Sequence, residues 1–175
     1  DDYPGGGPQK VGIAITDVLT GMYASLAIAA ALNHRERTGQ GQYIDTALLD
    51  SIVDFNANQI VSFFASGRIP IRWGNAHPQV IPYEVFPVAD GHIILAVGND
   101  GQFKRFCKEA GCPELAEEAR FATNSQRIIH RRELIPIIAD VMRQRTKQDW
   151  LDALEAATVP CGPINNMQQV LEDPQ

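Results

Sequence analysis

The chain has 175 residues, of which 45% are hydrophobic and 21% are charged, and its formal net charge is −6. These values are typical of a soluble globular protein that buries a core. The acidic balance, with a sequence pI near 5.1, argues against a nucleic-acid-binding protein, because such proteins usually carry a basic face.

The two ends of the chain have the composition of loops. Asp1 to Pro8 is rich in glycine and proline, and Glu172 to Gln175 is short and polar. Neither end resembles a natural terminus, since there is no initiator methionine and no closing element. We therefore expect the chain to be a piece of a longer protein.

Two long apolar helices are expected in the first third of the chain, at residues 18–37 and 47–65. Apolar residues recur there at steps of three and four, which is the period of a helix. The turn Gly39-Gln40-Gly41 should end the first helix, and a brief strand is expected at residues 42–45. Helices with so few charges are not stable alone in water, so another part of the protein or a second subunit should cover them.

Residues 68–82 contain prolines and read as a linker to a second unit. This unit should begin with a β-hairpin, because the pair Asp90-Gly91 separates two apolar runs at residues 85–89 and 92–97. Glycine accepts the positive φ that a tight primed turn requires. The hairpin predicts a short antiparallel sheet.

Helical patterns fill the rest of the chain and make this second unit α+β. Asp100 is a candidate N-cap, and Gly111 is the expected stop of the helix between them. A short helix should follow Pro113. Asn124 or Ser125 should cap a helical region that reaches Arg145, and Pro136 should start or kink its main segment. A capping box from Thr146 to Asp149 should open the next helix. An extended turn is expected at 159–164 and a last helix at 167–171.

The cysteines and histidines show no ligand pattern. Cys107, Cys112 and Cys161 form no CxxC pair, so we interpret them as inert thiols in a reducing, cytoplasmic compartment. The four histidines are dispersed, and no metal site is expected. The longest apolar stretch, Leu26 to Leu32, is far shorter than the roughly 20 residues that a membrane span needs, so no membrane partner is expected.

The stretch from Trp73 to Phe103 carries a family resemblance. Its motifs are Gly-Asn-x-His-Pro, Pro-Tyr-x-x-Phe, Ala-Asp-Gly and Val-Gly-Asn-Asp-Gly-Gln-Phe. In this order and spacing the chain resembles the class III CoA-transferase family, which includes formyl-CoA transferase, carnitine and bile-acid CoA-transferases and α-methylacyl-CoA racemase. Residues 38–42, 121–124 and 159–163 extend the resemblance to nearly the whole chain.

The resemblance implies a fold and an activity. Family members have a Rossmann-like large domain, an inserted small domain and two interlocked subunits. This chain would hold the helical end of the large domain (1–67), a linker (68–82) and an α+β small domain (83–175). The reaction would be transfer of CoA from an acyl-CoA donor to a carboxylic acid acceptor, by way of an aspartyl intermediate whose aspartate precedes Asp1. No cofactor is implied, since coenzyme A enters as the thioester substrate.

The loop Gly98-Asn99-Asp100-Gly101-Gln102 is the first candidate site. It joins a strand to a helix N-terminus, so its backbone N–H groups are available to an anion or to a developing negative charge. The resemblance matches it to a mobile glycine loop that covers the acyl-aspartyl intermediate. The alternative is an ordinary strand–helix turn.

Three further residues are candidates. Asp17 matches an aspartate that acts as acid/base partner in the racemase branch, although a helix N-cap is the alternative role. His77 is a candidate for substrate contact, or else a structural hydrogen-bonding group. Arg72, with Arg68, is placed to meet CoA phosphates or to remain a solvated charge. Two alternatives for the whole protein stay open: an α-methylacyl-CoA racemase and a non-catalytic assembly or binding module.

Overall fold

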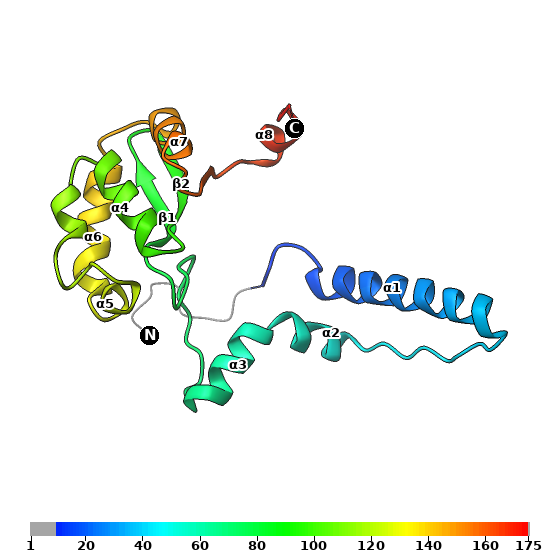
Figure 1. Cartoon of the computed structure of the whole chain (residues 1–175). Helices are drawn as coiled ribbons and strands as arrows, with labels where there is room; N and C mark the ends of the chain where they lie inside the picture. The colour runs from blue at the N-terminus through cyan, green and yellow to red at the C-terminus, as the bar shows by residue number, and fades with distance from the viewer. Residues whose placement is uncertain (1–9, 175) are drawn as a thin grey trace. The chain divides into compact units, whose positions relative to one another are not determined.

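The computed structural model describes residues 10–174, and the chain divides into two compact units between Arg72 and Trp73. This boundary falls inside the expected linker at residues 68–82. Figure 1 shows the elements in chain order. Each unit is described by itself.

The first unit consists of three helices, α1 (Ile15–Thr38), α2 (Leu48–Phe55) and α3 (Ala57–Ser66). α1 packs against α2. Glycines end two of the helices: Gly39 has φ 75° and its N–H donates to the Arg35 carbonyl at 2.8 Å, and Gly67 has φ 67° and donates to Phe63 at 2.7 Å. These left-handed residues are tolerated because glycine has no Cβ. The stop expected for the first helix at Gly39-Gln40-Gly41 is confirmed.

Two expectations for this unit are wrong. The single helix expected at 47–65 is broken at Asn56, whose side-chain amide donates to the Ile52 carbonyl at 2.8 Å. Such local side-chain bonds compete with the helical backbone pattern. The strand expected at 42–45 has no regular structure, because no strand in the described part of the chain pairs with it. A strand needs a partner for its backbone groups.

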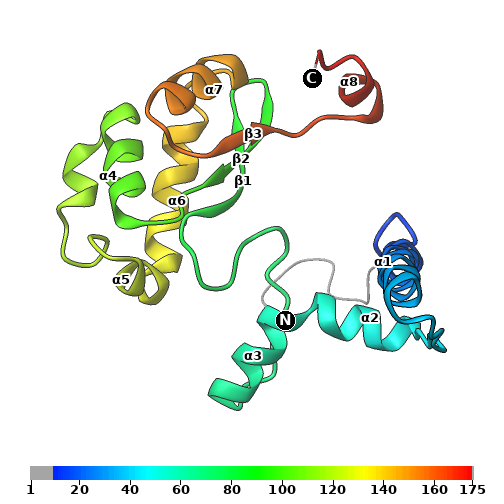
Figure 2. The same cartoon turned by 45° about the vertical axis from the view of Figure 1, so that its right-hand side comes forward.

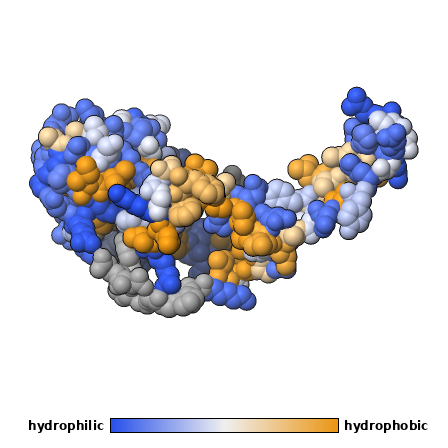
Figure 3. All heavy atoms as spheres, turned by 90° about the horizontal axis from the view of Figure 1, so that it is seen from below, coloured by the Kyte–Doolittle hydropathy of each residue, from blue (hydrophilic) through white to orange (hydrophobic). Residues whose placement is uncertain are grey.

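Apolar side chains of the first unit are exposed. Among its described residues only Ser51 is buried, whereas Met22, Leu26, Leu49 and Phe64 are each at least half exposed. Figure 3 shows hydrophobic side chains in orange over these helices, while the second unit is mostly blue. The helices therefore present faces that further protein must cover.

The apolar part of α1 is longer than Leu26–Leu32, the longest apolar stretch expected from the sequence. Over its 24 residues it contains an 18-residue window with a mean hydropathy of 1.6, which is long and apolar enough to cross a bilayer by length and composition alone. Threonine, glycine and alanine between the aliphatic residues extend the apolar stretch beyond Leu26–Leu32. A core helix of a soluble protein passes the same test, and the absence of a membrane partner stays a prediction.

The second unit is built on a small antiparallel sheet. β1 (Tyr83–Val88), β2 (Gly91–Ala96) and β3 (Cys161–Pro163) lie in the order β1–β2–β3 (Figure 2). Alternate residues point to one face because the side-chain period of a strand is two. The residues buried on this face are Phe86, Val88, Ile93 and Leu95.

The hairpin between β1 and β2 is confirmed, but its turn differs from the expected one. Val88 pairs with Gly91, so the two loop residues are Ala89 and Asp90. Neither of them has a positive φ, and Gly91 with φ 152° begins β2 instead. Asp90 has a further use, since its carboxylate accepts a hydrogen bond from the N–H of Lys147 at 2.7 Å.

Helices cover the buried face of the sheet (Figures 1 and 2). α6 packs on β1, α7 packs on β2 and β3, and α4 packs against α7. The helical elements of this unit are α4 (Asp100–Glu109), the 3₁₀ helix η1 (Pro113–Ala116), α5 (Asn124–Ile129), α6 (Arg131–Met142), α7 (Lys147–Ala156) and α8 (Met167–Leu171). The described fold is thus helix-rich with a three-stranded antiparallel sheet, as the α+β prediction requires. A Rossmann-like arrangement stays a prediction.

The caps of these helices confirm one expectation and correct three. Thr146 and Asp149 form the capping box of α7. Asn99 rather than Asp100 caps α4, and Thr123 rather than Asn124 or Ser125 caps α5. Pro136 lies inside α6 and does not start it, whereas the alternative of a kink at Pro136 stays a prediction. The chain breaks earlier, at His130, and Pro136 is exposed.

The core of the second unit is aromatic and aliphatic. Trp150 is fully buried, stacks on Phe106 with 6.3 Å between ring centroids, and donates its indole N–H to the Met142 carbonyl at 2.8 Å. This bond gives the buried indole N–H the hydrogen-bond acceptor that it would otherwise lack. All buried hydrophobic residues of the described chain lie between Ile81 and Val159.

Candidate functional site

The loop from Gly98 to Gln102 closes on itself through two side chains. The Asn99 carbonyl oxygen Oδ1 accepts a hydrogen bond from the N–H of Gln102 at 2.9 Å, which caps α4. In return, Gln102 Oε1 accepts from the N–H of Gly98 at 2.6 Å. This reciprocal arrangement resembles a capping box moved one residue toward the strand. These two bonds define the backbone of the loop.

Asp100 does not cap the helix but binds an arginine. Its carboxylate oxygen lies 2.8 Å from Nη2 of Arg127 in α5. Asp100 is 47% exposed, whereas the Arg127 side chain is fully buried. Burial lowers the pKa of Arg127, and the bond to Asp100 raises it. The buried guanidinium is therefore stabilised by a carboxylate that keeps part of its hydration.

Arg127 uses the rest of its donors on backbone carbonyls. Its Nε donates to Ile81 O at 2.7 Å, its Nη1 donates to Phe121 O at 2.9 Å, and its guanidinium lies 4.3 Å from the centre of the Phe103 ring. These contacts join the residues before β1, the segment before α5 and the first turn of α4. Arg127 thus fixes three segments with one planar, multiply donating group.

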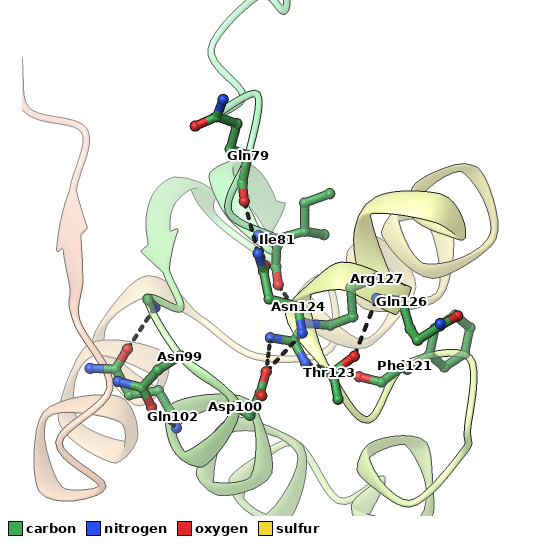
Figure 4. A network of polar contacts seen from close by, with 11 residues as sticks. Gln79, Ile81, Asn99, Asp100, Gln102, Phe121, Thr123, Asn124, Gln126 and Arg127 are labelled. Atoms are coloured by element: carbon green, nitrogen blue, oxygen red, sulfur yellow. Dashed lines mark hydrogen bonds and ion pairs between the residues drawn. The ribbon is translucent and has the colours of Figure 1, made fainter. Parts of the chain in front are cut away.

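Asn124 completes the connection to the residues before β1 (Figure 4). Its backbone N–H donates to the same Asp100 carboxylate oxygen at 2.8 Å. Its side-chain amide donates to Gln79 O at 2.8 Å, and its Oδ1 accepts from the N–H of Ile81 at 3.1 Å. The glycine loop is therefore held at Asp100 from two sides. At its other end the Gly98 N–H binds the Gln102 side chain, next to Val97, whose N–H donates to Pro82 O at 2.9 Å.

His77 is linked to this network through Gln79. The N–H of Gln79 donates to Nδ1 of His77 at 3.0 Å, so the ring proton of a neutral His77 is on Nε2. The imidazole stacks on Tyr83 with 5.3 Å between ring centroids. Desolvation lowers the pKa of His77 below its ordinary value of 6.5, and the charge of Arg131 lowers it further. His77 is thus a neutral, half-buried ring at neutral pH.

Arg131 holds the segment around His77 in place. Its Nη2 donates to the His77 carbonyl, and its guanidinium lies 4.5 Å from the centre of the Trp73 ring. The N–H of Val85 donates to Asn75 Oδ1 at 3.2 Å. The Trp73–His77 segment is therefore bound to both β1 and α6.

Glu84 adds a second titratable group to this region. It points to the core face of β1, and its Oε1 is buried without a hydrogen-bond partner among the described residues. Desolvation raises the pKa of Glu84, and the charge of Arg131 opposes this effect. A buried acceptor without a donor is costly.

We expect Glu84→Gln to stabilise the protein near pH 7. The folded-state pKa of Glu84 is raised, so the cost of its charge is absent below the unfolded value near 4.5 and grows as pH rises through the folded value. Glutamine mimics the protonated form. The gain should be at most about 1 kcal/mol, because part of the side chain stays in water.

Thermal unfolding of the full-length protein at pH 4 and pH 7 tests this prediction. The variant should melt higher than the wild type at pH 7 and nearly equally at pH 4. Glu155→Gln, at an exposed position of α7, is the matched control and should change stability by less than about 0.5 kcal/mol at either pH. A loss of stability at pH 7 in Glu84→Gln would contradict the assignment.

The remaining sequence candidates lie in the first unit and are exposed. Asp17 is in the first turn of α1, where a carboxylate suits the helix dipole, but the N-cap is Ala14. The N-cap role proposed for Asp17 is therefore wrong, and its acid/base role stays a prediction. Arg72 and Arg68 are exposed at the end of this unit. Their contact with CoA phosphates also stays a prediction.

A cavity between the described residues of the first unit has an acidic lining. It has a volume of about 240 Å³ and is lined by Asp45, Asp50, Asp54, Tyr23 and neighbouring residues. The Tyr23 hydroxyl donates to the Asp54 carboxylate, and this bond raises the pKa of Tyr23. Three carboxylates disfavour an anion such as a CoA phosphate. We do not assign the cavity to the substrate.

Sequence reasoning missed the residues that position the loop. Arg127 and Asn124 are recognisable in the chain, but their role depends on segments that are 24 to 46 residues away. A usable signal was that Arg127 lies seven residues before the buried Leu134, on the side of a helical pattern that faces the core. An arginine in such a position is buried only when it is paired.

Comparison with known proteins gives one family. The model of CoA-transferase family III matches residues 2–175. A succinate–glutarate CoA-transferase of Agrobacterium fabrum is 49% identical over 98% of this chain and 43% of its own length. The human succinyl-CoA:glutarate CoA-transferase is 38% identical, with 97% and 39% covered. This chain spans less than half the length of these relatives.

Solved structures agree with this result. A CaiB/BaiF family protein from Brucella suis is similar with a TM-score of 0.76 and 44% identity, covering all of this chain and 46% of the other. A hypothetical protein from Mycobacterium tuberculosis has a TM-score of 0.85 and 27% identity, with 98% and 45% covered. The match over almost every residue, at these identities, shows that the chain belongs to CoA-transferase family III.

Proposed function

We propose that the protein containing this chain transfers CoA from an acyl-CoA to a free carboxylate. The observation that carries the proposal is the family match over residues 2–175, and the similarity to succinate–glutarate CoA-transferases makes succinyl-CoA and glutarate the first substrates to test. Relatives named for oxalate and mesaconate also act on dicarboxylates. We therefore propose a dicarboxylate acceptor.

The proposed reaction proceeds through an aspartate outside this chain. Its carboxylate attacks the acyl-CoA carbonyl, giving a mixed anhydride and CoA thiolate. The thiolate then attacks the aspartyl carbonyl, which releases the donor acid and leaves an aspartyl-CoA thioester. The acceptor carboxylate attacks the aspartyl carbonyl of this thioester, which gives a second mixed anhydride and releases CoA thiolate. The thiolate then attacks the acceptor acyl carbon, forming the new acyl-CoA and releasing the aspartate. Each step breaks one bond to an acyl carbon and forms another. The last step regenerates the aspartate.

The Gly98–Gln102 loop is proposed to cover this intermediate. The first N–H groups of α4 have no acceptor within the helix, and the positive end of the helix dipole favours an oxyanion. The Asp100–Arg127 bond and the Asn124 N–H hold one side of the loop. On the other side the Gly98 N–H donates to the Gln102 amide, which belongs to the loop itself. We propose that this side opens for substrate.

Turnover by the full-length protein tests the proposal. Succinyl-CoA and glutarate should give glutaryl-CoA and succinate, and hydroxylamine should trap the activated aspartate as a hydroxamate visible by peptide mass. The 175-residue chain alone should be inactive. If α-protons of a branched acyl-CoA exchange with deuterated water and no hydroxamate forms, the racemase is the correct function, and Asp17→Asn should then abolish that exchange. If neither reaction occurs, the chain belongs to a non-catalytic module.

We expect Gly98→Ala to increase hydrolysis of the donor relative to transfer. Gly98 does not have a positive φ, so the backbone accepts alanine, but the new Cβ would lie 3.2 Å from Gln102 Oε1. The Gln102 amide must therefore move, which weakens its hydrogen bond to the Gly98 N–H. Such a bond contributes about 1 kcal/mol, which corresponds to a several-fold change in the hydrolysis rate. Less complete closure admits water to the thioester.

The ratio of succinate released to glutaryl-CoA formed measures this effect. Gly162→Ala is a matched control in the same unit, because its Cβ would meet only Ile94 at an ordinary 3.5 Å. The control should keep the wild-type ratio. An unchanged ratio in Gly98→Ala would exclude the loop from covering the intermediate.

We also propose that the full-length protein is a cytoplasmic homodimer. The exposed apolar faces of α1, α2 and α3 support a large covering surface. Sedimentation of the full-length protein should give a dimer at low micromolar concentration, and a stable monomer would contradict the proposal.

A further inference from the structure

The C-terminal end of α4 brings two cysteines together. The helix ends in a Schellman motif: Gly111 has φ 74°, its N–H donates to Lys108 O at 3.2 Å, and the N–H of Cys112 donates to Cys107 O at 2.9 Å. In this motif the third residue from the helix end and the second residue after the cap have side chains in contact. Both positions are cysteine here.

The two thiols occupy different environments. Cys107 is fully buried in the core, and Cys112 is partly exposed and packs against the same core. The neighbouring Cys112 and burial raise the pKa of Cys107, and the proximity of Cys107 lowers the pKa of Cys112. Cys112 is the accessible thiol of the two, and Cys107 lies buried beside it. Reactivity of cysteine follows thiolate character and exposure.

We propose that Cys107 and Cys112 form a reversible intramolecular disulfide when the protein meets hydrogen peroxide. The Schellman motif places the two side chains next to each other at the helix end, and both pack in the same core. This modification site is independent of the proposed CoA transfer, and it replaces the interpretation of these two thiols as inert.

The chemistry takes two steps. The Cys112 thiolate attacks one peroxide oxygen and forms a sulfenic acid, while the O–O bond breaks. The other oxygen leaves as hydroxide and takes up one proton, which gives water. The Cys107 sulfur then attacks the Cys112 sulfur, and the sulfenic oxygen leaves as water with the Cys107 proton. Overall, two thiols and one peroxide give one disulfide and two waters. The thiols lose two electrons, and peroxide gains them.

The third cysteine, Cys161, differs from Cys112 in the direction of its pKa shift and from both cysteines in its position. Cys161 lies in β3, and desolvation raises its pKa. It is not adjacent to the Schellman motif in the sequence, and the turn geometry that joins Cys107 to Cys112 gives it no partner there. We therefore expect Cys161 to stay reduced under the conditions that oxidise the pair.

Peptide mass spectrometry of the full-length protein tests this inference. The native protein is treated with a small excess of hydrogen peroxide, unfolded, alkylated with iodoacetamide and digested with trypsin. Because Lys108 separates the two cysteines, trypsin places them in peptides 106–108 and 109–120. These peptides should appear joined by a disulfide, with a mass that is two hydrogen atoms below the sum of the two free peptides. Dithiothreitol should separate them. A monomer band on a non-reducing gel excludes a link between two chains.

Variants identify the order of attack. In Cys107→Ser, dimedone should label Cys112 as a sulfenic acid, whereas in Cys112→Ser the buried Cys107 should stay unlabelled. Cys161→Ser is the matched control and should keep the joined peptides. The inference is overturned if Cys112 gains two oxygens without a link, if both peptides stay alkylated, or if either cysteine links to another partner. Circular dichroism of each variant verifies that the fold is retained.

Discussion

Residues 73–174 expressed alone should unfold in one cooperative transition, whereas residues 10–72 expressed alone should not. All buried hydrophobic residues of the described chain lie between Ile81 and Val159. The sheet, its covering helices and the Trp150 cluster therefore form a closed core within the second unit. A domain of this size typically has a free energy of unfolding of about 5–10 kcal/mol.

The first unit lacks the burial that cooperativity requires. In its described residues no hydrophobic side chain is buried, and α1 buries nothing. An isolated helix is marginal in water because nucleation is costly and tertiary packing supplies most of its stability. We expect partial helicity that melts gradually, or aggregation through the exposed apolar faces.

Far-UV circular dichroism against urea distinguishes these outcomes. The second unit should give a sigmoidal transition whose midpoint is the same by tryptophan fluorescence, since Trp73 and Trp150 both belong to it. The first unit should give a shallow, featureless curve. A steep transition in residues 10–72 would mean that its helices form a core of their own.

Arg127→Met should cost about 3–5 kcal/mol of stability, chiefly because it leaves two buried backbone carbonyls without a donor. The substitution keeps apolar volume but leaves the carbonyls of Ile81 and Phe121 without their buried donor. An unsatisfied buried acceptor costs about 1–3 kcal/mol. The contact with the Phe103 ring is lost as well.

A matched substitution separates this effect from loss of charge in general. Arg143 forms a 2.6 Å ion pair with Asp140, but both side chains are more than half exposed. Arg143→Met should therefore change the free energy of unfolding by less than about 1 kcal/mol. Arg127→Lys should fall between the two variants, because lysine keeps the charge but lacks the planar set of donors.

Urea unfolding of the second unit and of the full-length protein measures these differences. Hydrogen exchange adds a local readout: the N–H of Asn124, which donates to Asp100, should exchange faster in Arg127→Met. If Arg127→Met and Arg143→Met cost the same, Arg127 is not the residue that holds the three segments together.

The family and several elements followed from the sequence alone. Apolar residues at helical spacing predicted the helices, and Thr146 with Asp149 predicted the capping box of α7. The hairpin followed from Asp90-Gly91 between two apolar runs. These signals are local, because caps and tight turns are made within a few residues of each other. The ordered motifs of residues 73–103 indicated the family that the comparisons then showed.

Only the tertiary structure decided the partners of these residues. Asp100 has the composition of an N-cap, but Asn99 takes that place because Arg127, 27 residues later, binds the Asp100 carboxylate. The helix cap at Thr123 was likewise not expected from the sequence, which offered Asn124 and Ser125; the Asn124 N–H instead binds Asp100, 24 residues earlier. Cys107 and Cys112 show no motif spacing, yet a left-handed Gly111 joins them. Local patterns determine where helices and turns form, whereas the free energy of burying a charge or a thiol depends on groups that only the folded chain brings near.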